Sequence, residues 1–319
     1  MPDAPGSFPA VSVVIPVYNS APMLRELVRR LEAVFMSRGT PFEVLLVDDG
    51  SRDASWQTIS ALAAELAFVR GLRLMRNYGQ HNALLCGVRA ATAPVIVTMD
   101  DDLQHPPEEV PRLLAKLEEG HDVVYGTPIQ ERHGLYRDVA SRLTKLALES
   151  AMGVPAARDV SAFRAFRTVL RNGFAETRSP SLSLDVLLSW SATRYAAVPV
   201  DHRPRQQGRS NYTVARLVAH AFNMMTGYSA LPLHLASFVG FFFTLFGMGV
   251  LAFVIGRYLL EGSVVHGFAF LASIIAIFSG AQLFALGVLG QYLGRVHFRS
   301  MERPAYVVSE ETGSGDARA

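Results

Sequence analysis

The stretch Pro94-Val-Ile-Val-Thr-Met-Asp-Asp-Asp-Leu-Gln-His-Pro-Pro107 joins an apolar run to three consecutive aspartates and then to a proline pair that suits a first helical turn. The apolar run indicates a buried strand, so Asp100 to Asp102 would stand at its carboxyl end. Three adjacent carboxylates repel one another, and a bound divalent cation is one way to offset that repulsion. A solvated turn before a helix is the alternative, because aspartate favours turns and Glu108 and Glu109 would complement the helix dipole.

Around this stretch, short β-rich runs alternate with amphipathic segments, a pattern typical of a mostly parallel sheet in an α/β fold. One predicted helix covers Leu24 to Phe35, with Leu24, Leu27, Val28, Leu31 and Val34 on one face. The predicted strands are Val11 to Ile15, Glu43 to Val47, Gly71 to Met75, Val95 to Met99 and Asp122 to Tyr125.

Polar residues follow four of these strands directly, and the carboxyl ends of parallel strands share the edge where open α/β folds bind ligands. The segments are Pro16 to Asn19, Asp48 to Ser51, Arg76 to Gly79 and the aspartate cluster. Turn chemistry alone does not require four such segments, so they favour the metal interpretation of the cluster. Glycine-rich phosphate loops are absent from the sequence, and a carboxylate-held metal would neutralise a pyrophosphate instead. The combination indicates a nucleotide-sugar ligand.

Two apolar segments near the C-terminus, about 233–255 and 268–293, are each long enough to span a bilayer. A buried helical pair in a soluble protein is the alternative, but the run Phe241 to Phe246 has no polar face. The loop from Glu261 to Gly267 carries no Lys or Arg, whereas arginines precede the first segment and follow the second. The positive-inside rule therefore predicts a hairpin of two spans in the cytoplasmic membrane, with both termini and the catalytic domain in the cytoplasm.

The predicted domains follow from these segments: a flexible N-terminus (1–10), a catalytic domain (11–211), an amphipathic juxtamembrane helix (212–231), the two spans (232–294) and a cytoplasmic segment (295–319) whose tail after Ser309 is disordered. The 30 Lys and Arg nearly balance the 28 Asp and Glu, which argues against nucleic acid as a partner. Cys86 is the only cysteine, so an intrachain disulfide is excluded.

Four motifs together resemble the inverting GT-A glycosyltransferases of the polyprenyl-phosphate type. They are Val13-Val-Ile-Pro-Val-Tyr-Asn19, Val47-Asp-Asp-Gly-Ser-Arg-Asp53, Arg76-Asn-Tyr-Gly-Gln-His81 and Asp100-Asp-Asp-Leu-Gln-His-Pro-Pro107. The similarity extends over about 10–308, including Gly290-Gln-Tyr-Leu-Gly-Arg295. It implies a GT-A, Rossmann-like sheet followed by interfacial helices and the transmembrane hairpin.

The resemblance implies sugar transfer from a nucleotide donor, expected to be a UDP-sugar, to undecaprenyl or another polyprenyl phosphate, giving a lipid-linked sugar for the cell envelope. Mg²⁺ or Mn²⁺ would be held by Asp100, Asp102 and Gln104. The nucleotide would contact Pro16, Tyr18, Asn19, Asp48, Asp49, Asn77 and Asp101, with Asp49 accepting from the base. A packed turn aromatic is the alternative for Tyr18, and a helix cap for Gln104. A homo-oligomer, specifically a tetramer, is likewise only an implication of the resemblance.

For the acceptor and the diphosphate, the resemblance implies contacts from Arg132, Arg137, Ser141, Arg205, Arg209 and Ser210. The helix expected over Leu135 to Ala151, which carries Arg137, would lie on the membrane surface or present an ordinary solvated face. With Asp102, Asp159 is the candidate catalytic residue and matches a position given the role of base. A phosphate monoester is already largely anionic at neutral pH, so positioning the sugar or an arginine is an equal alternative for Asp159.

Three departures from the family pattern lie where sugar and acceptor should meet. Thr127 to Gln130 lacks an expected arginine, Asn211 replaces a lysine, and the segment after Asp159 is one residue shorter. These differences leave the donor sugar open. A processive polysaccharide synthase or a diacylglycerol glycosyltransferase is the enzyme alternative, although neither tryptophan lies in a Gln-x-x-Arg-Trp signature. A lipid flippase subunit, the non-enzyme alternative, would not explain the carboxylates at the strand ends.

Overall fold

The computed structural model describes residues 10–128, 159–177, 183–201, 231–261, 268–301 and 303–313. Within these ranges an eight-stranded sheet has the order β7-β5-β6-β4-β1-β2-β3-β8. Strands β6 and β8 run opposite to the others. The strands are β1 (Val11–Val17), β2 (Phe42–Asp48), β3 (Val69–Leu74), β4 (Val95–Thr98), β5 (Val123–Pro128), β6 (Arg164–Arg167), β7 (Tyr195–Val200) and β8 (Val308–Thr312).

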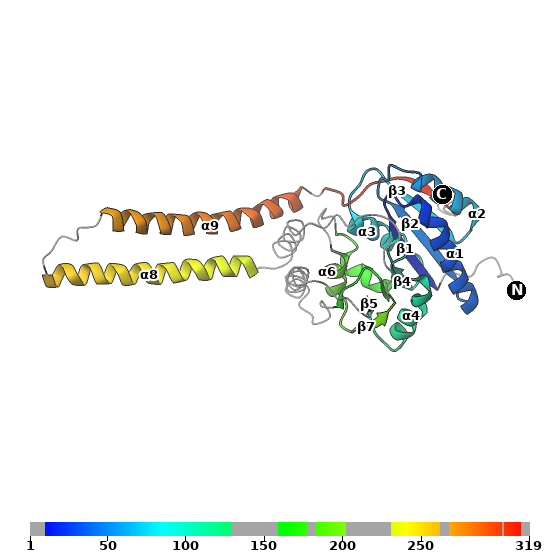
Figure 1. Ribbon diagram of the computed structural model, residues 1–319, viewed down its shortest axis with the longest axis horizontal. Coiled ribbons are helices and arrows are strands. Elements are labelled where there is room, and N and C mark those ends of the chain that lie inside the picture. Colours follow the sequence, from blue (N-terminus) through cyan, green and yellow to red (C-terminus); the bar gives the residue numbers. More distant parts are fainter. Residues whose placement is uncertain are drawn as a thin grey trace.

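Helices cover both faces of this sheet, as Figure 1 shows. The alternation of β1 divides the core, because Val13 and Ile15 face one hydrophobic cluster and Val14 faces another. The first cluster contains side chains of α1 (Ala21–Arg38), α2 (Ser55–Glu65) and α4 (Val110–Glu118), which the 3₁₀ helix η1 (Pro107–Glu109) precedes. The second contains side chains of α3 (Gln80–Ala90), the 3₁₀ helix η3 (Thr168–Phe174) and α6 (Leu184–Ser189).

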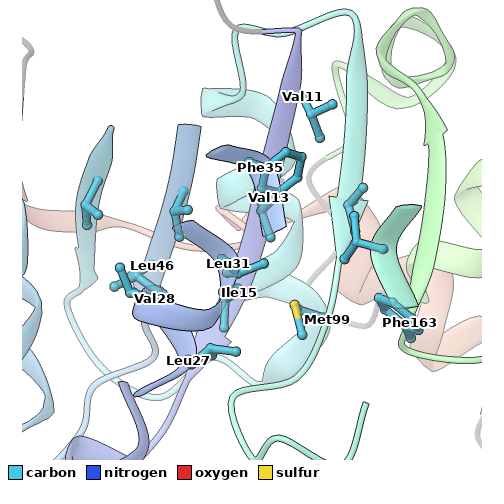
Figure 2. Packing of buried hydrophobic residues seen from close by; sticks show 14 of the residues in the cluster. Val11, Val13, Ile15, Leu27, Val28, Leu31, Phe35, Leu46, Met99 and Phe163 are labelled. Carbon is cyan, nitrogen blue, oxygen red and sulfur yellow. The ribbon is translucent and has the colours of Figure 1, made fainter. Parts of the chain in front are cut away.

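Helix α1 shows how the sequence sets these elements. Pro22 lies in its first turn, and Gly39 ends it in the left-handed conformation at φ 61°. The buried face includes Leu27, Leu31 and Phe35 (Figure 2). The prediction that Val34 completes this face is wrong, because Phe35, four residues after Leu31, is fully buried while Val34 is only half-buried. Each such fully buried side chain contributes about 1.5–3 kcal/mol relative to exposure.

Two long helices, α8 (Leu231–Glu261) and α9 (Phe268–Ser300), lie side by side and project away from the sheet (Figure 1). The stretches Leu233–Leu260 and Ile277–His297 are long and apolar enough to cross a membrane, with mean hydropathies of 2.4 and 1.2. The apolar window that defines each stretch contains no buried residue, which contradicts the alternative of a helical pair inside a soluble core. Both helices extend beyond the predicted segments.

The five predicted strands are confirmed to within three residues at each end. The prediction of a disordered tail after Ser309 is wrong for the described part, because residues up to Thr312 belong to β8. This strand pairs with β3, where Arg73 lies opposite Glu310. The pairing brings opposite charges together in a segment whose own sequence, Val-Ser-Glu-Glu-Thr, has little apolar content.

Candidate functional site

The turns after β1, β2, β3 and β4 meet at the carboxyl edge of the sheet, as the sequence predicts. The turns after β1 and β4 are joined by the backbone N–H of Tyr18, which donates to Asp101 Oδ2 at 3.2 Å. The side chain of Tyr18 is 44% exposed, so the packed turn aromatic is not what the structure contains. The ring is instead available to a ligand beside the acidic loop.

Asn19 joins the turns after β1 and β2. Its backbone N–H donates to Ser51 Oγ at 3.0 Å, and its Oδ1 accepts from the Arg52 N–H at 2.8 Å. Asn19 has φ 54°, a left-handed conformation that asparagine tolerates better than most residues. The amide oxygen of Asn19 is therefore engaged in holding the turn.

Asp49 joins the turns after β2 and β3. Its carboxylate accepts the backbone N–H groups of Tyr78 at 2.6 Å and Gly79 at 2.9 Å. Burial raises the pKa of Asp49, against these two hydrogen bonds, which lower it, and with a further rise from Asp48. Gly50 has φ 69°, and a Cβ there would lie 2.6 Å from the carbonyl carbon of Arg76, so only glycine lets the two turns pack this closely.

The acidic loop after β4 divides its three carboxylates between different partners. Asp100 Oδ1 accepts from Gln80 Nε2 at 2.6 Å, and Asp102 Oδ1 accepts the Gln104 N–H at 3.1 Å. Leu103 is buried with φ 59°, an unfavourable conformation for a branched side chain. Non-glycine residues held in this region cluster at functional sites, where the surrounding structure compensates for the strain. The geometry therefore differs from an ordinary solvated turn.

Asp101 points toward the turn after β1. Burial raises the pKa of its carboxyl group, opposed by hydrogen bonds from Ser20 and Tyr18, and Asp102 raises it further. The loop therefore keeps negative charge in a place where charge is costly, as is common at functional sites.

The donor set of the loop fits a hard divalent cation. Asp100 and Asp102 offer carboxylate oxygens, the ligands that such a cation prefers. Gln104 does not cap a helix, since Pro106 precedes η1, so the capping alternative fails. The described parts of the chain contain no group of three or more His, Cys, Asp or Glu side chains arranged to hold a metal. Two carboxylates suit an ion of the Mg²⁺ type, which usually keeps waters and substrate phosphates as its other ligands.

A buried ion pair holds the segment after Asp159 against the end of β4. Arg164 pairs with Asp185 of α6 and donates through Nε to Thr98 Oγ1 at 3.0 Å. Thr98 in turn donates to the carbonyl oxygen of Ala162 at 2.9 Å. The neighbouring Phe163 stacks on His105, which follows the acidic loop, with ring centroids 5.3 Å apart. These contacts bring the segment that carries the exposed Asp159 to the acidic loop.

The model of glycosyl transferase family 2 matches residues 12–171, from β1 into η3. The chain belongs to this family. It is 37% identical over 306 residues to the undecaprenyl-phosphate 4-deoxy-4-formamido-L-arabinose transferase of Pseudomonas paraeruginosa, covering 93% of this chain and 89% of the relative. The transferase of the same name from Shewanella sediminis is 38% identical over 303 residues, covering 94% and 92%. The protein is therefore a glycosyltransferase.

The GT-A fold of this glycosyltransferase also occurs in solved structures. The glucosyl-3-phosphoglycerate synthase of Mycobacterium tuberculosis, crystallised with Mn²⁺, uridine diphosphate and phosphoglyceric acid, superposes with a TM-score of 0.51. It is 20% identical, and the alignment covers 68% of this chain and 76% of that one. The likeness establishes the Rossmann-like architecture of the sheet.

Three residues that the sequence predicts to bind the nucleotide of this glycosyltransferase differ in their exposure to solvent. Asn77 is exposed at the site, whereas Pro16 is buried within β1, beyond the last residue that pairs with β4. Asp48 is fully buried, and its Oδ1 accepts the Ser51 N–H at 3.1 Å. Asp48 therefore lies inside the turn after β2 and not at its exposed surface.

The acceptor residues predicted for this glycosyltransferase lie outside the described residues, as does the helix expected over Leu135 to Ala151. The helix expected over 212–231 also lies outside them, except for Leu231, which is the first residue of α8. The six residues are Arg132, Arg137, Ser141, Arg205, Arg209 and Ser210.

Sequence reasoning missed two residues that shape the described edge. Gln80 lies inside a quoted motif, but nothing in its spacing indicated that it would reach Asp100. Arg73 lies on β3 with its Nε 3.5 Å from Asp48 Oδ2. Its signal was a charged residue within the predicted strand Gly71 to Met75, which contains no other charged residue.

Proposed function

We propose that this glycosyltransferase moves a sugar from a UDP-sugar to undecaprenyl phosphate, with inversion at the anomeric carbon, at the cytoplasmic face of the inner membrane. The lipid-linked product would serve modification of a cell-envelope glycan or lipid. The observation that carries the proposal is an acidic loop joined to the turns after β1 and β3, in a chain with two helices of membrane length. Such a chain suits a water-soluble nucleotide donor and a lipid acceptor.

In this proposal Asp100 and Asp102, with Gln104, hold Mg²⁺ or Mn²⁺ against the diphosphate. When bound, the ion neutralises the charge that develops on the departing nucleoside diphosphate. Tyr18, Asn19 and Asn77 line the nucleotide pocket, and Asp49 supports it by holding the backbone of Tyr78 and Gly79. Because the carboxylates are already in place, little reorganisation accompanies the reaction.

The attacking oxygen belongs to a phosphate monoester, which is largely anionic at neutral pH and needs little proton abstraction. Asp159 therefore either positions the sugar or an arginine, or acts as the base. Arg132, Arg137, Arg205 and Arg209 are the residues proposed to bind the acceptor phosphate and the diphosphate, since guanidinium groups make bidentate hydrogen bonds to phosphate.

We propose that the amino end of α8 and the carboxyl end of α9, which are the ends nearest the sheet, lie on the cytoplasmic side of the membrane. Arg295 lies in the last turn of the second membrane-length stretch, and Arg299 and Arg303 follow it, whereas the loop between α8 and α9 carries no Lys or Arg. The large apolar side chains of both helices are exposed, including Phe238 at 70% and Leu293 at 70%. A bilayer would bury this surface.

The relatives' names support 4-deoxy-4-formamido-L-arabinose as the first sugar to test. The departures at Thr127 to Gln130, at Asn211 and after Asp159 make a related sugar the competing outcome.

The deciding experiment incubates the full chain with undecaprenyl phosphate, Mg²⁺ or Mn²⁺ and a panel of UDP- and GDP-sugars, and follows the sugar into the lipid phase. We expect transfer from one UDP-sugar, abolished by a chelator and by Asp102→Ala. Glu65→Gln, which alters an exposed ion pair with Arg25 on the surface of α2, is the control and should retain activity. Transfer that persists undiminished in Asp102→Ala and in chelator would reject the metal role, and no transfer from any donor would reject the function.

A further inference from the structure

The chain returns to the catalytic sheet after the two long helices. It leaves the sheet at β7 and comes back as β8, at the opposite edge (Figure 1). Arg73 of β3 lies directly opposite Glu310 of β8, and Leu72 lies opposite Glu311. The segment that follows the membrane helices is thus part of the same sheet as the nucleotide turns.

Glu310 makes two polar contacts, one across this strand pair and one to helix α2. Arg73 Nη1 donates to Glu310 Oε1 at 2.6 Å, and Trp56 Nε1 donates to Glu310 Oε2 at 2.9 Å. The Arg73 guanidinium also lies over the Trp56 ring, 5.7 Å from its centroid. The Glu310 side chain is 51% exposed, so this ion pair adds little to overall stability. Its effect is to fix where the Arg73 side chain lies.

Arg73 lies beside a carboxylate that needs compensation. Its Nε is 3.5 Å from Asp48 Oδ2, an oxygen that accepts no hydrogen bond within the described residues. Asp48 is fully buried next to Asp49, and a buried charge is costly unless it is paired. The other oxygen of Asp48 holds the Ser51 N–H, and Ser51 Oγ holds the Asn19 N–H. Contacts therefore run continuously from β8 to the turns after β2 and β1.

We propose that Arg73 and Glu310 are positioning residues for the donor nucleotide: Arg73 compensates Asp48, and Glu310 keeps Arg73 in place. The inference rests on the proposed function, because the ordered turns are those assigned to the nucleotide. The segment that follows the membrane helices thereby contributes to the affinity for the donor without touching it.

The test compares Glu310→Gln and Arg73→Gln with Glu311→Gln in the full chain. Glu311 is the neighbour of Glu310 on β8, is similarly exposed and pairs with Arg70 instead of Arg73. We expect the KM for the UDP-sugar to rise between about threefold and tenfold in Glu310→Gln and Arg73→Gln, with kcat unchanged and Glu311→Gln within twofold of the parent. Faster hydrogen exchange at the Ser51 amide should accompany the rise, because that amide donates to Asp48.

A charge swap separates positioning from simple docking of the tail. Arg73→Glu combined with Glu310→Arg restores opposite charges between β3 and β8 but puts a carboxylate beside Asp48. We expect β8 amides to be protected again while KM and Ser51 exchange remain elevated. Full rescue by the swap, or Glu310→Gln behaving like Glu311→Gln, would overturn the proposal. The exchange measurement needs no nucleotide, so a chain that binds no UDP would refute the proposed function while the positioning role is still decided.

Discussion

Glu43 at the amino end of β2 and Asp49 just beyond its carboxyl end are both buried carboxylates, yet their pKa values shift in opposite directions. Burial alone would raise the pKa of Glu43, but hydrogen bonds from Ser12 and Thr92 and the charge of Arg70 outweigh it, so the pKa is lowered. The pKa of Asp49 is raised because burial outweighs its two backbone donors.

The comparison shows that hydrogen-bond donors and neighbouring charges, and not burial alone, decide in which direction the pKa of each carboxyl group shifts. At the amino edge Glu43 Oε1 accepts from the Ser12 hydroxyl at 2.6 Å and from the Thr92 N–H and hydroxyl, each at 2.7 Å. At the carboxyl edge Asp49 and Asp101 lie beside other carboxylates. One edge stabilises the fold, whereas the other retains negative charge that a ligand can compensate.

Replacing Glu43 should produce the largest effect on stability. Glu43→Leu leaves the buried donors of Ser12 and Thr92 without their acceptor, and Arg70 without one of its two carboxylates. We expect the free energy of unfolding to fall by about 3 kcal/mol. Urea or thermal unfolding of the full chain measures this, with Glu65→Gln as the exposed control. A loss below about 0.5 kcal/mol would contradict the structural role of the amino edge.

Replacing Asp102 should instead reduce activity and leave stability almost unchanged. Asp102→Asn removes a proposed metal ligand, so we expect a loss of turnover of at least about 100-fold, because even outer-shell partners of metal ligands cost 10–100-fold. Stability should change little, since Asn can still accept the Gln104 N–H. Initial rates and melting curves of the same sample measure both quantities. Equal losses of activity and of folded protein would remove the distinction between the two edges.

Asp101 tests the sign of the pKa shift. The pKa of Asp101 in the folded state lies above its unfolded value. The stability that this group contributes is therefore present below the unfolded pKa and is lost as pH rises through the folded pKa. At neutral pH the free energy of unfolding of Asp101→Asn should therefore exceed that of the parent by about 1 kcal/mol or less. Near pH 3 the two should be equally stable. Asp53, on the same edge, is the control with the opposite sign. Burial would raise the pKa of Asp53, but hydrogen bonds from Ser55 and Ala21 outweigh burial and lower it. Asp53→Asn should therefore melt at a lower temperature than the parent at neutral pH.

Asp122, just before β5, should give an effect on stability that changes with pH. Burial would raise its pKa, but hydrogen bonds from Arg194 and Thr193 lower it to about 2. Stability from this group is present above the unfolded pKa near 3.8 and is lost as pH falls toward about 2. Asp122→Asn should therefore be less stable than the parent at pH 7 and converge with it near pH 2. Melting temperatures across this range measure it, and a constant difference would contradict the assignment.

The sequence predicts the strands whose residues are buried on both faces, because parallel strands such as β1 and β4 are continuous apolar runs. It does not predict β6, Arg-Ala-Phe-Arg, since a strand with two arginines gives no apolar signal. Arg164 is buried there only because Asp185, distant in sequence, is its partner. Strand β8 was missed for the same reason, as its glutamates depend on Arg70 and Arg73.

For the site, strand ends and residue types sufficed to place the acidic loop and the turns at one edge. Which carboxylate contacts which turn depends on backbone conformation that sequence spacing does not encode. Asp101 reaches Tyr18, and Leu103 adopts a positive φ, only in the folded loop. Likewise, sequence spacing does not indicate that the buried Asp48 lies beside Arg73, whose guanidinium is also over the Trp56 ring of α2.

Strand β8 also determines how the catalytic domain can be handled in isolation. A fragment that stops before α8 loses the membrane helices and β8 together, which leaves the backbone N–H and C=O groups of β3 unpaired along one side. An uncovered edge strand is a template for pairing with another chain, and so a cause of aggregation. Soluble forms of this enzyme should therefore join residues 303–313 to the catalytic domain through a short linker in place of the hairpin.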